Sequence, residues 1–219
     1  MIIQINAQIV QSFVKIPLIG TGDVFMYYGL QNFYQNHRRY VQSRSDEQLL
    51  GRNVDAGLRP GLARLPGPCG FKALATGPPS ESYRELDTID LFYNFNSSVI
   101  QVPLLKTGNS WWTDKNVKFR NPESHNLSAA FAGTARPPYW HKPVYLLDEE
   151  DEKNNGYIND DFIIWMRVSA FATFRNLYRR VSRKGQFADG LPAGNYTFHI
   201  SYSILSYYPR QSFILLDAV

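Results

Sequence analysis

The residues best suited to acid–base or metal chemistry are scattered along this 219-residue chain. The histidines lie at positions 37, 125, 141 and 199, with no i, i+4 pair and no cysteine cluster beside them, so a zinc site lacks its spacing. No GxSxG motif marks a nucleophile. An enzyme would need a pocket that gathers Asp114, His141 or His199, and no motif requires one. We therefore predict no catalytic centre, cofactor or metal.

The acidic run DEEDEKNNGYINDD comes nearest to a metal-binding loop. Asp151, Asn155 and Gly156 occupy positions one, five and six of a calcium loop. Position three is Lys153 and position twelve is Phe162, where calcium needs an oxygen ligand and a bidentate acid. A solvated turn is the better interpretation of this run.

The single cysteine, Cys69, lies in a segment over 51–80 that is rich in Pro and Gly and indicates a loop. A lone cysteine suggests a reducing compartment, or a chain that has lost its pairing partner. Three sequons, at Asn96, Asn126 and Asn195, lie in or beside expected loop boundaries and favour the secretory pathway.

Composition and charge narrow the class of protein. Aromatic residues make up 15% of the chain and charged residues 19%, which is typical of a globular protein. The 23 basic residues are nearly matched by 19 interleaved acidic ones, so we expect no nucleic-acid partner. The longest apolar runs, Phe162–Met166 and Phe213–Leu216, fall far short of the ~18 residues that span a bilayer. The first ten residues do not resemble a signal peptide.

We expect one domain over 1–219. Hydrophobic spacing predicts the helices and strands that position the candidate residues named above. We expect extended chain over 2–19, a helix over 24–43, and two antiparallel strands over 100–104 and 115–120 around a turn at Gly108-Asn109.

Three further elements are expected towards the C-terminal half. Residues 161–166 favour a buried strand over the start of a helix. Residues 169–181 have helical spacing and basic residues near their end. The basic cluster over 175–184 is interpreted as a solvated face, with contact to acidic headgroups the weaker alternative. Alternation over 195–204 predicts the clearest strand.

Two aromatic groups are candidate partner interfaces. Trp111 and Trp112 would face opposite sides of a strand, and Trp is enriched in binding hot spots. Tyr139, Trp140 and Tyr145 form a second group, held by nearby prolines. For both groups, packing in the core is favoured slightly over contact with a partner.

Six strings resemble, in the same order, the cell cycle control protein 50 family, the β-subunits of class-four P-type ATPases that flip phospholipids. They cover about 25–45 and 96–202, and the vertebrate C-type members are the most similar. The strings are VFMYYGLQNFYQNHRRYVQSR, WWTDKNVKFRNP, FAGTARPPYWHKPVYLLD, NNGYINDDFIIWMR, FRNLYRRV and LPAGNYTFHISY.

The resemblance implies an ectodomain built as an antiparallel β-sandwich with a few short helices, held between two transmembrane helices. It also implies a non-catalytic role: binding the ATPase's lumenal loops, supporting its folding and exit from the endoplasmic reticulum, and sustaining phospholipid translocation. Endoplasmic reticulum, Golgi and plasma membrane are the implied locations. Asn96 and Asn195 match glycosylation positions of the family.

The chain also departs from the family pattern. Both transmembrane helices are missing, the paired cysteines are reduced to Cys69, and residues 1–20 and 203–219 are atypical ends. We therefore expect a truncated form. The alternatives are a soluble glycan- or lipid-binding β-sandwich, or a non-functional splice product.

Overall fold

The computed structural model describes residues 2–6, 11–16, 22–38, 41, 44–52, 88–96, 98–132, 142–201 and 211–218. The chain divides into two compact units. The first unit comprises Met1–Phe33, Leu86–Asn109 and Ala172–Val219; the second comprises Tyr34–Glu85 and Ser110–Phe171. The prediction of one domain over 1–219 stays a prediction.

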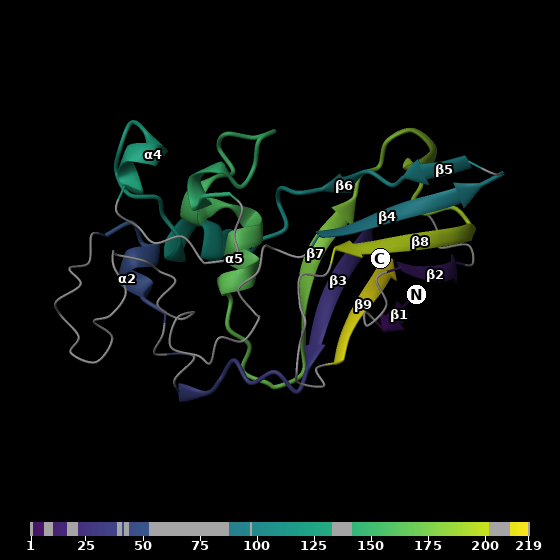
Figure 1. Ribbon diagram of the computed structural model, residues 1–219, viewed down its shortest axis with the longest axis horizontal. Coiled ribbons are helices and arrows are strands. Elements are labelled where there is room, and N and C mark those ends of the chain that lie inside the picture. Colours follow the sequence, from purple (N-terminus) through teal and green to yellow (C-terminus); the bar gives the residue numbers. More distant parts are fainter. Residues whose placement is uncertain are drawn as a thin grey trace. The chain divides into compact units, whose positions relative to one another are not determined.

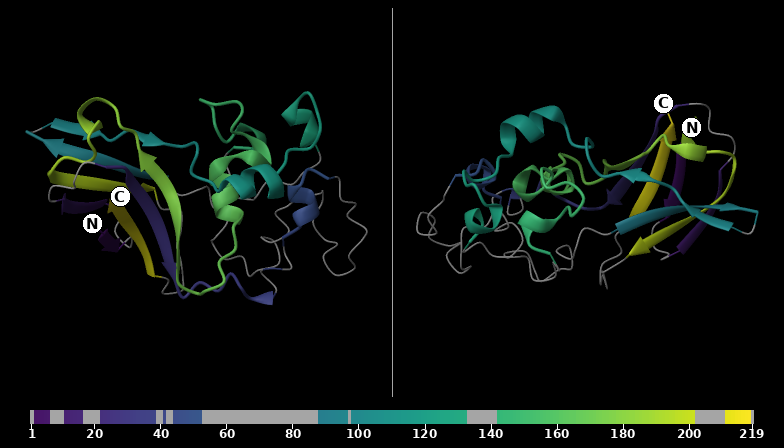
Figure 2. Two further views of the ribbon diagram at one scale, coloured as in Figure 1. Left: turned by 180° about the vertical axis from the view of Figure 1, so that it is seen from behind. Right: turned by 90° about the horizontal axis from the view of Figure 1, so that it is seen from above.

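The first unit consists of two antiparallel sheets. One has the strand order β1 (Ile2–Asn6), β9 (Gln211–Ala218), β3 (Val24–Gln31), β7 (Phe174–Val181) and β6 (Leu104–Leu105). The other has the order β2 (Gln11–Ile16), β8 (Gly194–Ser201), β4 (Thr88–Phe95) and β5 (Ser98–Gln101). In Figure 1, β3, β7 and β9 run steeply, whereas β4 and β8 run nearly horizontally, so the strands of the two sheets cross. The views of Figure 2 show the same crossing.

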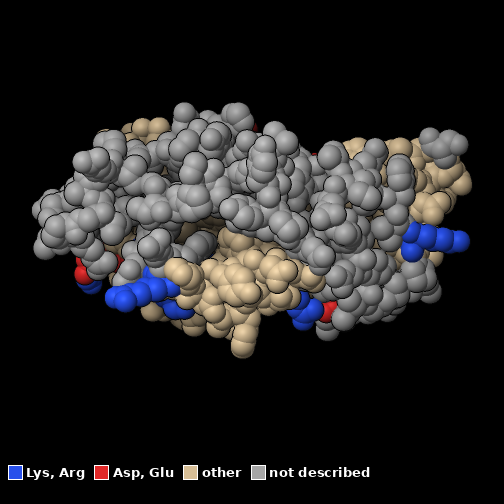
Figure 3. All heavy atoms as spheres, turned by 60° about the horizontal axis from the view of Figure 1, so that its bottom comes forward, with Lys and Arg blue, Asp and Glu red and all other residues tan. Residues whose placement is uncertain are grey.

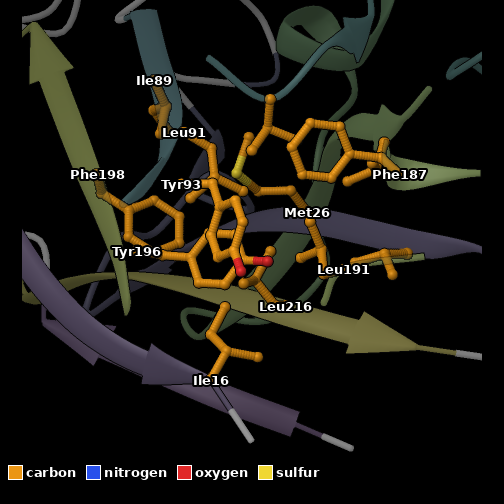
Figure 4. Close-up of a cluster of buried hydrophobic side chains, with 13 residues drawn as sticks. Ile16, Met26, Ile89, Leu91, Tyr93, Phe187, Leu191, Tyr196, Phe198 and Leu216 are labelled. Carbon is orange, nitrogen blue, oxygen red and sulfur yellow. The ribbon is translucent and has the colours of Figure 1, made fainter. Parts of the chain in front are cut away.

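An apolar core joins the two sheets. Met26 and Leu216 come from the first sheet, and Leu91, Tyr196 and Phe198 come from the second; all five are fully buried. Figure 4 shows these side chains converging between the strands. Burying a side chain of this size contributes about 1.5–3 kcal/mol. The predicted antiparallel β-sandwich with short helices is therefore confirmed.

The helices predicted over residues 24–43 and 169–181 are wrong over 24–31 and 174–181, because these segments form the strands β3 and β7, which pair with each other. Near the end of the first prediction, the described residues Arg38 and Val41 are helical. Their register shifts next to Met26, which faces Arg179, while Tyr27 faces Leu177. Tyr178 is therefore the extra residue of a β-bulge. The bulge reverses the alternation of β7, whose core-facing residues are Tyr178 and Val181, so the apolar spacing of this strand imitates a helix.

Other strand predictions had mixed outcomes. The extended segment expected over 2–19 is confirmed by β1 and β2, and the strand expected over 195–204 is confirmed by β8 as far as Ser201. Of the pair expected around Gly108, the first corresponds to β5 and β6, but the second, over 115–120, is wrong: it forms the π-helix η2 (Asp114–Lys118). The C-terminal segment 203–219, expected to be an atypical end, contains β9, which lies between β1 and β3.

The second unit is built from short helices around its own core. Besides η2 they are α2 (Asp46–Leu49), α4 (Leu127–Ala130), η3 (Val144–Leu146), η4 (Gly156–Ile158) and α5 (Asp160–Met166). A further short helix, η5 (Gly185–Phe187), belongs to the first unit. The buried core of the second unit consists of Leu49, Phe119, Phe131, Val144, Tyr157, Phe162, Ile163 and Met166.

The strand favoured over 161–166 is wrong, because this segment is α5. Asn159 caps the helix: its side chain accepts a hydrogen bond from the Phe162 amide at 2.9 Å. Asp160 and Asp161 in the first turn suit the positive end of the helix dipole. These local polar signals decide the structure of an apolar run whose period is ambiguous.

Two predictions fall outside the described residues: most of the loop over 51–80, and Cys69 within it. Among the helices that the structure describes, none is long and apolar enough to span a membrane.

Candidate functional site

Trp111 and Trp112 are the most exposed pair of neighbouring large aromatic side chains in the described chain. Their residues are 64% and 72% exposed. The core packing favoured from the sequence is therefore wrong for both. Its premise was also wrong, because Trp112 begins the helical turn that leads into η2 instead of lying in a strand.

A buried carboxylate contacts residues on both sides of the tryptophans. Asp160 has no exposed side-chain surface. Its Oδ1 accepts hydrogen bonds from the Ser110 amide at 3.2 Å and from the Ser110 hydroxyl. Its Oδ2 lies 2.9 Å from the Lys115 ammonium group. Because Ser110 precedes Trp111 and Lys115 lies three residues after Trp112, Asp160 fixes the whole turn.

A second carboxylate organises the cations around the pair. Asp114 is buried, and its Oδ1 accepts a hydrogen bond from Lys118 Nζ at 2.7 Å. Its Oδ2 lies 3.9 Å from Arg167 Nη1. The Arg167 guanidinium in turn lies over the Trp111 ring, 4.7 Å from the ring centroid. We call the surface formed by Trp111, Trp112, Lys115, Lys118 and Arg167 the tryptophan platform.

Sequence reasoning missed the buried amides behind the platform. Asn155 accepts a hydrogen bond from the Asp148 amide and donates to the Asp148 carbonyl. Asn154 donates to the Asp148 carboxylate at 2.7 Å and accepts from the Asp160 amide at 3.0 Å. Asn159 donates to the Asn154 carbonyl. The signal that could have found this network is the run of asparagines around Gly156.

The acidic run is only partly the solvated turn that was expected. Glu149, Glu150 and Glu152 are exposed, but the asparagines that follow are buried in the network just described. Within the described chain, no group of three or more His, Cys, Asp or Glu side chains could hold a metal ion.

The residues considered for acid–base chemistry do not share one unit. Asp114 lies in the second unit with Lys118 and Arg167, whereas His199 lies on β8 of the first unit, 4.6 Å from the Phe92 ring. His141 lies outside the described residues.

The second aromatic group is described only at Tyr145, because Tyr139 and Trp140 lie outside the described residues. Tyr145 is half-buried, and its ring lies 6.4 Å from that of Phe131, in the core of the second unit. Core packing therefore holds for this one member.

The three sequon asparagines are exposed. Asn96 lies at the turn after β4 with a φ of 43°, and Asn195 lies on β8. Asn126 caps α4, because its side chain accepts a hydrogen bond from the Ser128 amide at 2.9 Å. Glycosylation at all three stays a prediction.

The basic cluster over 175–184 is not a uniformly solvated face. Arg179 is buried, with its guanidinium 4.3 Å from the centroid of the Tyr178 ring. Arg175 lies 5.2 Å from the Tyr27 ring centroid. On the face shown in Figure 3, the Lys and Arg side chains of the described residues form separate small groups. Basic charge is therefore dispersed over the described part of that face.

Comparison with known proteins gives close similarities. The sequence model of the LEM3 (ligand-effect modulator 3) family / CDC50 family matches residues 4–218. Cell cycle control protein 50C of Bos taurus is 51% identical over 206 residues, which cover 90% of this chain and 58% of the relative. Cell cycle control protein 50A of Mus musculus is 48% identical over 205 residues, or 88% of this chain and 53% of the relative.

A more distant relative is ALA-interacting subunit 3 of Arabidopsis thaliana. It is 28% identical over 210 residues, which cover 88% of this chain and 49% of that protein. The chain thus spans about half the length of the curated relatives it matches.

Proposed function

Because the chain belongs to the LEM3/CDC50 family, as its sequence motifs indicated, we propose that it is the extracytoplasmic part of a non-catalytic flippase subunit. The catalytic partner would be a class-four P-type ATPase that translocates phospholipids. The observation that carries this proposal is the family match over residues 4–218, which includes segments of both structural units. The printed name of the Arabidopsis relative, an interacting subunit, agrees with a role in a complex.

The contacts of the described carboxylates support a role without catalysis. Asp160 is bound by Ser110 and Lys115, and Asp114 by Lys118. A general acid or base must instead reach a substrate. These carboxylates bind groups of the protein beside exposed aromatic side chains, as expected of a protein that acts through its surface.

We further propose that this surface supports folding of the ATPase, its exit from the endoplasmic reticulum and lipid transport at the Golgi and plasma membrane. Exposure of Asn96, Asn126 and Asn195 supports glycosylation on the lumenal side. Anchoring in the membrane would come from transmembrane helices of the kind that the family carries.

The test is co-expression of the full-length protein that contains this sequence with a class-four ATPase, in cells lacking their own accessory subunits. We expect the ATPase to co-purify in detergent, to leave the endoplasmic reticulum, and to move fluorescent phosphatidylserine inwards. A P-type ATPase of another class is the control and should not co-purify. Failure of every class-four ATPase to co-purify would refute the proposal.

A further inference from the structure

We propose that the tryptophan platform is a docking site for an acidic peptide segment that carries an apolar side chain among its carboxylates. The segment would belong to the partner in the complex, so the inference rests on the proposed function and names the site and the chemistry of the contact.

Exposure on a held backbone is the first observation. Water is a poor solvent for two adjacent indoles, yet Trp111 and Trp112 are exposed, while Asp160 binds Ser110 before them and Lys115 after them. A segment that is already ordered loses less conformational entropy on binding. Exposed tryptophans on such a segment are therefore suited to be binding hot spots.

Arg167 orders the platform further. Its guanidinium stacks on one face of the Trp111 ring and is directed by Asp114. Arginine stacked on an aromatic ring keeps donors for a carboxylate, with which it forms paired hydrogen bonds. The same surface can thus receive an apolar side chain on the indoles and a carboxylate beside them.

The charges of the platform are arranged in layers. The carboxylate side chains are 0% exposed at Asp160 and 8% at Asp114. The cationic side chains are 62% exposed at Lys118 and 45% at Arg167. Because the anions lie beneath and the cations face outward, an approaching molecule meets positive charge and indole rings. This complementarity selects an acidic partner.

A peptide fits these features better than a bilayer does. Binding to a lipid surface grows with buried apolar area and with the number of basic residues near the headgroups. Here the apolar area is two indoles, and the cations of the platform number three, Lys115, Lys118 and Arg167. What the platform offers instead is fixed geometry, which a defined peptide can match and fluid headgroups cannot.

The first experiment uses the full-length protein and its class-four ATPase. The variants are the double substitution Trp111→Ala/Trp112→Ala and the charge reversal Lys118→Glu, with Phe171→Ala as the matched control, an aromatic residue of the same unit that is 76% exposed. We expect a loss of ATPase capture of about thirtyfold or more for the double variant, the size expected for a hot spot, and a smaller loss for Lys118→Glu. The control should capture the ATPase normally.

The outcomes separate the two proposals. If wild type captures the ATPase and the double variant captures it equally well, the platform is refuted and the proposed function stands. If wild type captures no class-four ATPase, the proposed function fails. Equal circular dichroism spectra and melting temperatures of wild type and variants ensure that lost capture reports the surface and not the fold.

The second experiment tests the chemistry directly with the purified protein. The probes are a synthetic peptide of alternating Glu and Leu, the same peptide with Lys in place of Glu, and phosphatidylserine vesicles. We expect tryptophan fluorescence to shift with the Glu peptide alone, and the affinity to fall as salt rises. Absence of binding to the Glu peptide at millimolar concentration, or vesicle binding that depends on the tryptophans, would overturn the proposal.

Discussion

The two units of the chain satisfy their backbone hydrogen-bonding groups in different ways. In the first unit, long strands satisfy their backbone groups by pairing, and the interior is almost entirely apolar. In the second, helices of three to seven residues leave many backbone groups without helical partners. Buried asparagine side chains supply those partners. Long paired strands can therefore enclose an interior that is almost entirely apolar. Short helices instead need buried polar side chains, which bind the backbone groups that lack a helical partner.

Removing a core ring from the sheets should have the largest effect. Phe198 on β8 is fully buried between the sheets. We expect Phe198→Ala to lower the free energy of unfolding by about 3–5 kcal/mol, since a cavity replaces the ring. Denaturant titration followed by circular dichroism measures it. Val99→Ala, on the exposed part of β5, should change little; an equal loss there would show that burial does not decide stability in this unit.

The substitution Gly156→Ala should have the next largest effect on stability, and it should disturb only the second unit. Gly156 has a φ of 78°, and a Cβ there would overlap the Asn121 amide. That amide accepts a hydrogen bond from the Tyr157 backbone at 2.7 Å and donates to Asn155 at 2.9 Å. We expect Gly156→Ala to lose on the order of 1–2 kcal/mol to backbone strain. The collision adds a further loss, on the order of 1–3 kcal/mol.

Gly185 provides the matched control for this glycine. It also has a positive φ, 58°, but nothing lies within 4 Å of its added Cβ. Gly185→Ala should therefore show the strain alone. Hydrogen exchange should show lost protection near residues 148–160 in the Gly156 variant, with the sheets unchanged. Equal effects of the two substitutions would contradict the role given to Asn121.

The smallest expected effect is the dependence on pH of the stability of the first unit, to which Tyr196 belongs. Burial, and to a lesser degree the nearby Tyr93, raise the pKa of Tyr196 above its ordinary value. Below pH of about 10 both the folded and the unfolded state keep the proton, and the stability is fully present. As pH rises further, the unfolded state loses its proton first, so the stability falls through the folded pKa.

Tyr196→Phe should remove this dependence. The variant loses the hydrogen bond from the Tyr196 hydroxyl to the Pro192 carbonyl, about 0.5–1.5 kcal/mol near neutral pH, but should lose less stability than wild type between pH 9 and 11. Denaturant titrations across that range measure it. Tyr34→Phe, at an exposed position, should follow wild type; parallel curves for all three proteins would refute the linkage.

The fold could be predicted from the sequence where alternation is unbroken. β8 places Tyr196 and Phe198 on one face, and nothing interrupts that pattern. In β7 the bulge at Tyr178 reverses the phase, so the apolar spacing there resembles that of a helix. At α5 the decisive signal is the Asn159 cap, whereas the expectation of a strand rested on the apolar run alone.

The candidate site was located but not understood from the sequence. Trp111 and Trp112 were recognised as candidates because of their residue type. The residues on either side of them are bound by Asp160, which lies far along the chain, and no local pattern reports such a contact. The same holds for Asn121, whose side chain accepts a hydrogen bond from the Tyr157 amide at a separation of 36 residues.

The position of β9 affects how the protein is made. β3 is among the first strands to be synthesised, yet one of its neighbours, β7, is paired across a separation of 148 residues and the other, β9, comes later still. On the ribosome, both edges of β3 therefore stay unpaired until β7 and β9 have been synthesised, and distant pairing is slow and prone to aggregation. Newly made chains should therefore depend on chaperones during this interval, so the yield of the protein is set by its biosynthesis as much as by its final stability.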